Sequence, residues 1–89
     1  MSAVSVRVGS ILFEYTGGAE LVDGAGATVA ELFADLETRY PGIAFRVLDE
    51  QGVLRPHIAL FLDRRATRDA AAPLAGVGTV HVLGALSGG

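Results

Sequence analysis

The sequence predicts an α+β domain in which one main helix packs on one face of a mixed sheet of four or five strands. Two observations lead to this class. Apolar residues alternate with other residues near both ends of the chain, at 3–9 and 79–85. Segment 26–42 instead has apolar residues at helical spacing. The expected order of elements is therefore strand, strand, helix, strand, short strand, strand.

The first two strands are expected to form an antiparallel hairpin with a long connection. In segment 3–9, Val4, Val6 and Val8 fall on one face, which is typical of a half-buried strand. The apolar run 11–24 is interrupted by Gly17-Gly18. This pair predicts a turn, and we expect residues 19–23 to form the returning strand.

The helix at 26–42 has both a start signal and a stop signal. Thr28 followed by Glu31 is a capping box, and Pro41-Gly42 ends the pattern. Between them, apolar residues share one stripe while Glu31, Asp35 and Glu37 lie off it. The stripe contains Val29, Leu32, Phe33, Leu36 and Tyr40.

The second half of the chain is expected to supply the remaining strands. Segment 43–56 predicts a short helical turn followed by a loop at Gln51-Gly52. Segment 57–65 alternates as a strand, Asp63-Arg64-Arg65 predicts a tight turn, and a short strand is expected around 66–68. Segment 69–78 is expected to be a loop with one helical turn at most, and 79–85 is the last strand.

We expect the first and last strands to pair in parallel at the centre of the sheet. The predicted core is Val4, Val6, Val8, Val29, Leu32, Phe33, Leu36, Ile58, Leu60, Leu62, Val80 and Val82.

Composition bounds the class of protein. The chain has 89 residues, 51% of them hydrophobic and 19% charged, which fits one small folded domain. No apolar run approaches the ~20 residues that span a bilayer, and the start lacks the pattern of a signal peptide, so we expect a cytoplasmic protein with no membrane partner. The net charge of −3 argues against nucleic acid as a partner.

Self-contained catalysis is not expected. The chain has no cysteine, which excludes thiolate chemistry and cysteine zinc sites, and two histidines are too few for a metal site. It also has no lysine, so Gly24-Ala25-Gly26 is not a phosphate-binding loop of the P-loop type. Neither a bound cofactor nor a metal is expected.

The segments TVAELFADLETRYPG, HIALFLD and VHVLGALSGG, with Gly88-Gly89 as the last two residues, resemble the ubiquitin-like sulfur carrier family. The family includes the small subunit of molybdopterin synthase and the thiamin sulfur carrier. TGG at 16–18 and the pattern L-x-x-L-E-x-x-Y-P-G look closest to the carrier of an alternative cysteine pathway. The resemblance implies a β-grasp (ubiquitin-like) domain over 1–84 and a flexible C-terminal tail over 85–89.

The resemblance also implies the chemistry. An activating enzyme adenylates the Gly89 carboxylate with ATP, and a sulfide or persulfide sulfur displaces AMP to leave a thiocarboxylate. That sulfur is then donated in biosynthesis of cysteine, a cofactor or a natural product. Glycine at 88 and 89 suits a narrow channel because neither residue carries a Cβ. The carrier is thus a protein co-substrate and not an enzyme.

Two partner enzymes are implied, an adenylyltransferase/sulfurtransferase related to ubiquitin-activating enzymes and a sulfur-accepting enzyme. Phe61, His81 and Leu83 are expected on the sheet face away from the helix, as a docking surface. Arg64 and Arg65 would match an acidic partner or simply form a solvated turn. Leu86 and Ser87 are candidate contacts of the tail.

The chain departs from the family pattern in two places. Family members often carry an acidic turn before the last strand, whereas this chain has Gly76-Val77-Gly78, and many have a proline in the tail that is absent here. Two other functions stay open. One is a ubiquitin-like modifier conjugated through Gly89, and the other is a non-covalent interaction subunit.

Overall fold

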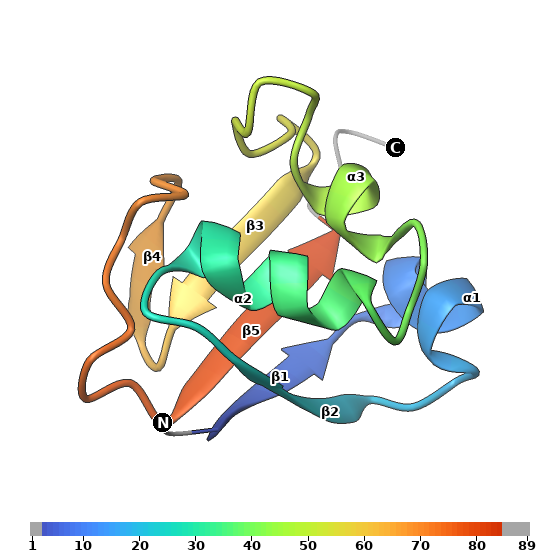
Figure 1. Ribbon diagram of the computed structural model, residues 1–89, viewed down its shortest axis with the longest axis horizontal. Coiled ribbons are helices and arrows are strands. Elements are labelled where there is room, and N and C mark those ends of the chain that lie inside the picture. The colour runs from blue at the N-terminus through green and yellow to red at the C-terminus, as the bar shows by residue number, and fades with distance from the viewer. Residues whose placement is uncertain (1–2, 85–89) are drawn as a thin grey trace.

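The computed structural model describes residues 3–84 of the chain, and these form a mixed sheet with helices on one face (Figure 1). The α+β prediction is confirmed. The elements in chain order are β1 (Ala3–Val8), a 3-10 helix (Ser10–Leu12), α1 (Phe13–Thr16), β2 (Leu21–Ala25), α2 (Val29–Glu37), α3 (Ile43–Val47), β3 (Ile58–Leu62), β4 (Arg65–Thr67) and β5 (Thr79–Gly84).

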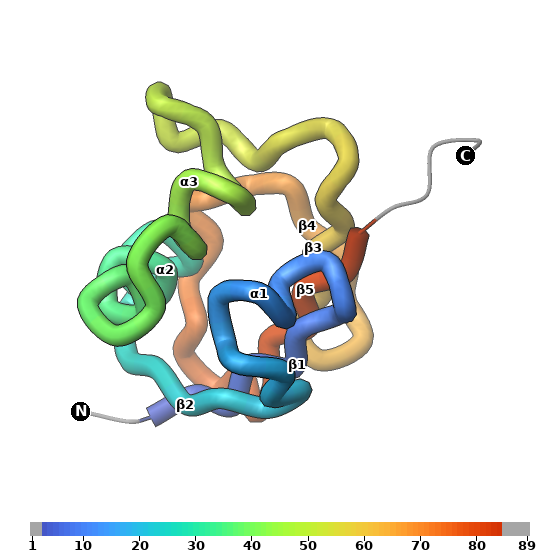
Figure 2. The backbone as a smooth tube through the Cα atoms, turned by 90° about the vertical axis from the view of Figure 1, so that its right-hand side faces the viewer, coloured from blue at the N-terminus to red at the C-terminus, as the bar shows by residue number. Residues whose placement is uncertain are grey.

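The sheet has five strands in the order β2-β1-β5-β3-β4. β1 and β5 are parallel neighbours inside the sheet, as the sequence predicts, and the other pairs are antiparallel. Because β5 is central, both of its edges are hydrogen-bonded along the strand. Figure 2 shows α2 and α3 together on one side of the sheet.

The core lies between α2 and the sheet. Every residue that the sequence places in the core is buried, because the alternating strand residues and the helical stripe face each other. The remaining buried hydrophobic residues come from α3, the connections and β2. They are Leu12, Val22, Ile43, Val47, Leu48, Leu54, Ala72 and Leu74.

The capping box of α2 forms with one change. Thr28 is the N-cap, and its hydroxyl accepts from the Glu31 backbone N–H at 3.2 Å. The Glu31 carboxylate accepts from the backbone N–H of Ala27, one residue before the N-cap, at 3.0 Å. Two N–H groups at the start of the helix are therefore satisfied by side chains.

Four local predictions are wrong. The helix expected at 26–42 is observed at Val29–Glu37, with Thr38 as its C-cap, so it ends before Pro41-Gly42. The strand expected at 19–23 is observed at Leu21–Ala25, because residues 10–16 form the 3-10 helix and α1 and lengthen the connection. Arg65 belongs to β4 and not to the turn, since it pairs with Leu62. His57 precedes β3, which begins at Ile58.

Candidate functional site

β5 ends directly before the segment in which the sequence predicts the functional residues. β5 runs through the middle of the sheet and reaches Gly84, which pairs with Ile58 of β3. Gly88 and Gly89, as well as Leu86, Ser87 and the expected tail 85–89, lie outside the described residues. Gly84 is therefore the last described point before the residues that would carry the chemistry.

Contacts from the β1–α1 connection hold this end of β5. The Gly9 backbone N–H donates to the Val82 carbonyl at 2.8 Å. The Ile11 side chain covers Gly84 so closely that a Cβ at position 84 would lie 3.2 Å from Cδ1 of Ile11. The position of Gly84 is thus set by β3 on one side and by Gly9 and Ile11 on the other.

The sheet face away from α2 carries the residues expected to form a docking surface. Phe61 of β3 and His81 of β5 are paired across the sheet, and both are half-buried. Leu83 lies two residues further along β5 and is 40% exposed. The structure therefore brings Phe61, His81 and Leu83 together next to the end of β5, and we call these three residues the sheet-face patch.

Arg64 and Arg65 lie at the opposite end of β3 from Gly84. Both are exposed, and within residues 3–84 neither forms an ion pair. They follow Asp63, which has a left-handed φ of 56°. Arg64 thus lies in the β3–β4 turn and Arg65 begins β4, so neither is part of the sheet-face patch at the end of β5.

The Asp63 carboxylate links this turn to the start of β5. It accepts from the backbone N–H groups of Gly78 at 3.2 Å and Thr79 at 3.0 Å. These bonds, first that of Thr79 and then that of Gly78, lower the pKa of Asp63 below its ordinary value, and the charges of His81 and Arg65 act in the same direction. The loop that replaces the family's acidic turn is therefore fixed by an acidic side chain from β3–β4.

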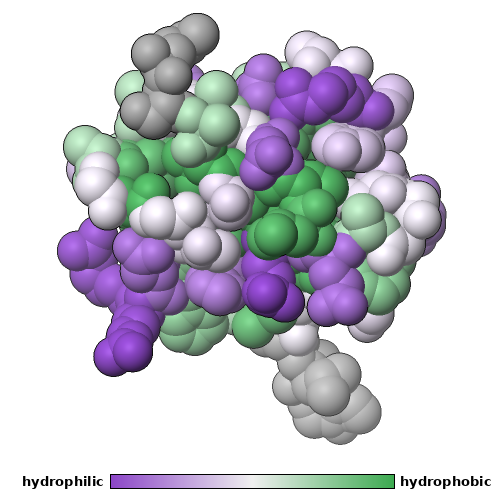
Figure 3. All heavy atoms as spheres, turned by 90° about the horizontal axis from the view of Figure 1, so that it is seen from below, coloured by the Kyte–Doolittle hydropathy of each residue, from purple (hydrophilic) through white to green (hydrophobic). Residues whose placement is uncertain are grey.

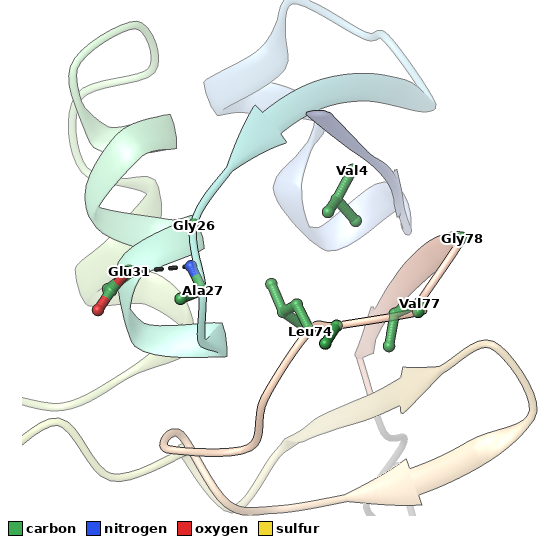
Figure 4. Close-up of a pocket in the computed structure, with 9 residues that line it drawn as sticks. Val4, Gly26, Ala27, Glu31, Leu74, Val77 and Gly78 are labelled. Atoms are coloured by element: carbon green, nitrogen blue, oxygen red, sulfur yellow. Dashed lines mark hydrogen bonds between the residues drawn. The ribbon is translucent and has the colours of Figure 1, made fainter. Parts of the chain in front are cut away.

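A cavity of about 680 Å³ lies at the other end of β5. Val4, Leu74 and Val77 surround it, and Glu31 lies at its border, bonded to Ala27 (Figure 4). Figure 3 views the molecule from the side of β1 and β2, where hydrophobic surface is bordered by polar atoms. Gly78, which also lines the cavity, is separated from Gly84 by roughly 17–20 Å of strand, so this cavity is remote from the end of β5.

A second exposed apolar surface was not predicted from the sequence. Phe45 of α3 and Val53 of the following loop are 59% and 55% exposed. Arg55 lies over the Phe45 ring, with its guanidinium carbon 4.5 Å from the ring centroid. The short, irregular pattern of segment 43–56 gave no signal for this arrangement, because the contacts are made between residues ten apart.

Nothing in the described part of the chain provides a metal centre or a membrane span. No group of three or more potential metal-ligating side chains is found within residues 3–84. In the same region no helix is long and apolar enough to cross a bilayer.

Comparisons with known proteins agree with this geometry. The model of the ThiS family matches residues 6–89. The sulfur carrier protein CysO of Mycobacterium tuberculosis (strain ATCC 25618 / H37Rv) is 32% identical over 91 residues, covering 97% of this chain and 98% of that protein.

Solved structures extend the comparison. A chain in the Amycolatopsis orientalis BexX/CysO complex superposes with a TM-score of 0.87 at 32% identity, covering 97% of this chain and 99% of that chain. The crystal structure of M. tuberculosis CysO gives a TM-score of 0.85 at 30% identity, covering 93% and 99%. SAMP1 from Haloferax volcanii gives 0.79 at 22% identity, covering 99% and 100%, which shows the shared ubiquitin-like fold alone.

Proposed function

The chain belongs to the ThiS family, and from this premise we propose that it is a CysO-like sulfur carrier whose Gly89 carboxylate is converted to a thiocarboxylate. The observation that supports this most is the extent of the family match, which runs from Val6 in β1 to Gly89. The proposal includes Gly89 as the last residue of the mature protein. Because activation consumes ATP, we place the protein in the cytoplasm.

The chemistry proceeds in three steps. A Gly89 carboxylate oxygen attacks the α-phosphorus of ATP on the activating enzyme, and pyrophosphate leaves. Sulfide then attacks the acyl carbon, and AMP leaves with the bonding electron pair. The resulting thiocarboxylate sulfur displaces the leaving group of an activated substrate, and water then cleaves the thioester to release the substrate thiol and restore the carboxylate.

The folded body supports this chemistry by holding the start of the tail. Gly84 is bound to β3 and covered by Ile11, so the five residues after it begin from a defined position. Fully extended, five residues reach roughly 17 Å, which is enough to enter an active site inside another protein. Gly88 and Gly89 lack a Cβ and so pass through a narrow channel.

The sheet-face patch docks the activating enzyme in this proposal. Its half-buried Phe61 and His81 and exposed Leu83 lie beside the end of β5. A partner that covers them is therefore positioned to receive the tail. Leu86 and Ser87 then contact the channel, while Arg64 and Arg65, at the far end of β3, would meet acidic groups at the rim of the same partner.

The direct test is incubation with ATP, sulfide and an activating enzyme, followed by intact-mass spectrometry. The account predicts a mass change that corresponds to replacement of one oxygen by sulfur, and no change in a variant that lacks Gly89. A chain that stays unmodified by an enzyme active on another carrier would instead favour a non-covalent interaction subunit. Conjugates that survive reductant and denaturant would favour a protein modifier.

A further inference from the structure

β2 forms one edge of the sheet (Figure 1). An edge strand presents backbone N–H and C=O groups to which another chain can add as a further strand. The other edge strand, β4, has only three residues and offers little to pair with. β2 has five residues, and Leu21 at its start is 52% exposed. β2 is therefore the edge at which a second copy of this chain would be expected to pair.

The register between β1 and β2 shows which backbone groups of β2 face outward. The Val8 N–H donates to the Glu20 carbonyl at 2.8 Å, so Glu20 points toward β1. Because backbone groups alternate in direction along a strand, those of Leu21, Asp23 and Ala25 point away from β1. These three residues carry the groups that a second copy would have to bond.

Two side chains of α2 and its C-terminal turn are bonded to these outward groups. Arg39 donates from Nη2 to the Asp23 carbonyl at 2.7 Å. Oδ2 of Asp35 accepts from the Ala25 N–H at 3.0 Å and also from Nη2 of Arg39 at 3.0 Å. The Ala25 amide, and after it Arg39, lower the pKa of Asp35, so this carboxylate is ionised at neutral pH. Asp35 and Arg39 thus form one hydrogen-bonded unit across the edge of β2, and we call them the edge pair.

Gly24 allows α2 to lie close enough to β2 for these bonds. A Cβ at position 24 would lie 2.6 Å from Cδ1 of Leu32 and 3.1 Å from Cδ2 of Leu36. A larger residue would therefore push the helix away from the strand. Asp35 and Arg39, one helical turn apart, reach the edge because Leu32 and Leu36 pack directly on Gly24.

We propose that the edge pair closes β2 against pairing with a second copy of this chain and so keeps the protein monomeric. In the antiparallel register that uses all three outward residues, Asp23 lies opposite Asp23 of the second copy, and Leu21 lies opposite Ala25. The edge pair occupies the Asp23 carbonyl and the Ala25 N–H of both copies. Both bonds of the central pair and one bond in each outer pair are thereby excluded.

The side chain of Asp23 adds a second obstacle, because two carboxylates directly opposite each other repel. Asp23 is exposed, so this charge remains when the edge pair is removed. The inference goes beyond the proposed function and does not depend on it, since it concerns only the edge of the sheet.

The test uses the full-length chain in an Asp23→Thr background, which removes the opposed charges. Asp35→Ala/Arg39→Ala in this background should dimerise with a Kd at least about tenfold lower than Asp23→Thr alone, measured by sedimentation equilibrium. Glu50→Ala/Arg64→Ala also removes one acid and one base, both exposed and outside β2 and α2, and should leave the Kd within about twofold. Circular dichroism checks that each variant is folded.

A single cysteine tests the register of the dimer. The chain has no cysteine of its own, so Asp23→Cys introduces one thiol at the centre of the expected contact. When the edge pair is also replaced by alanine, a disulfide-linked dimer should form at least about tenfold faster in a glutathione buffer than in Asp23→Cys alone, because residues directly opposite in antiparallel strands lie within disulfide distance. Each rate is divided by the rate of reaction with a small thiol reagent, which corrects for changes in thiol exposure and reactivity.

Three results would overturn the inference. The first is a monomer in every variant, and the second is association of the Glu50→Ala/Arg64→Ala control as strong as that of the edge-pair variant. The third is association without faster disulfide formation, which would place the contact on another surface. If the double variant does not fold, Arg39→Ala alone decides by the same two measurements, because it changes a side chain that is 46% exposed.

Discussion

At the scale of single residues, Gly26 decides how β2 is joined to α2. A Cβ at this position would lie 2.6 Å from the Leu32 backbone nitrogen and 2.8 Å from the Glu31 carbonyl carbon. Backbone atoms of a helix do not move aside as the end of a side chain does. The connection therefore requires a residue without a side chain.

Gly26→Ala should lower the free energy of unfolding by about 1–3 kcal/mol, measured by urea denaturation. Gly9→Ala is the matched control, because Gly9 has a φ of −81° and a Cβ there would make only ordinary contacts at 3.5 Å. That variant should unfold at the wild-type midpoint or slightly above it. Equal losses in both variants would reject this reading of Gly26.

Asp63 makes stability depend on pH. Its pKa is lowered in the folded state by the Thr79 and Gly78 amides, so ionised Asp63 stabilises the fold above the unfolded pKa. This contribution is lost as the pH falls from about 4 through the lower folded pKa. Asp35, Glu37 and Asp49 are lowered by backbone amides and act in the same direction.

Asp63→Asn removes the charge while asparagine tolerates the left-handed φ of 56°. We expect the free energy of unfolding to fall less steeply between about pH 5 and 2 than in the wild-type chain, as measured by urea titrations at each pH. Glu14→Gln, at an exposed position on α1, is the control. An unchanged pH slope in Asp63→Asn would contradict the role given to this carboxylate.

At the scale of elements, α2 depends on its N-cap. The Thr28 hydroxyl accepts from the Glu31 N–H, and Glu31 in turn accepts from Ala27. Thr28→Ala should therefore lower the thermodynamic stability by about 1 kcal/mol, whereas Thr28→Ser keeps the acceptor and most of the stability. Chemical denaturation of the three proteins measures this, and equal loss in the serine variant would show that the hydroxyl bond is not the cause.

The elements that the sequence predicts best are those whose pattern alone determines their position. β1, β3, β5 and α2 each bury one regular face. The apolar residues on that face, at alternating positions in the strands and at helical spacing in α2, are all in the core. β2 was placed two residues too early, because the apolar run before it forms helical turns whose end depends on Gly17 in a left-handed conformation. The extent of β2 depends on its pairing with β1, and sequence patterns do not show which residues pair.

The candidate site was predicted in part for the same reason. Alternation along β3 and β5 correctly places Phe61, His81 and Leu83 on one face. The cover that Ile11 provides over Gly84, and the contact of Arg55 with the Phe45 ring, join residues from separate segments. Such contacts follow from packing, and no local pattern of residues indicates them.

At the scale of the whole molecule, the proposed function requires a partner enzyme to dock on the sheet-face patch. Leu83→Asp puts a charge into the sheet-face patch and should raise the KM of the activating enzyme for the carrier by at least about tenfold, with kcat little changed. Val53→Asp is the matched control, because Val53 is 55% exposed in the loop between α3 and β3, outside the sheet. An equal rise in KM for both variants in steady-state assays would reject the sheet-face patch as the docking surface.

The central claim is that this folded body presents the acyl group of Gly89 for sulfur transfer. Fragmentation of the intact protein by mass spectrometry, after incubation with ATP, sulfide and the activating enzyme, tests it most directly. The account predicts that the added sulfur replaces an oxygen in fragments that contain Gly89 and in no fragment that ends before it. Sulfur found in any other part of the chain, or a mature chain that continues beyond Gly89 without trimming, would contradict the account.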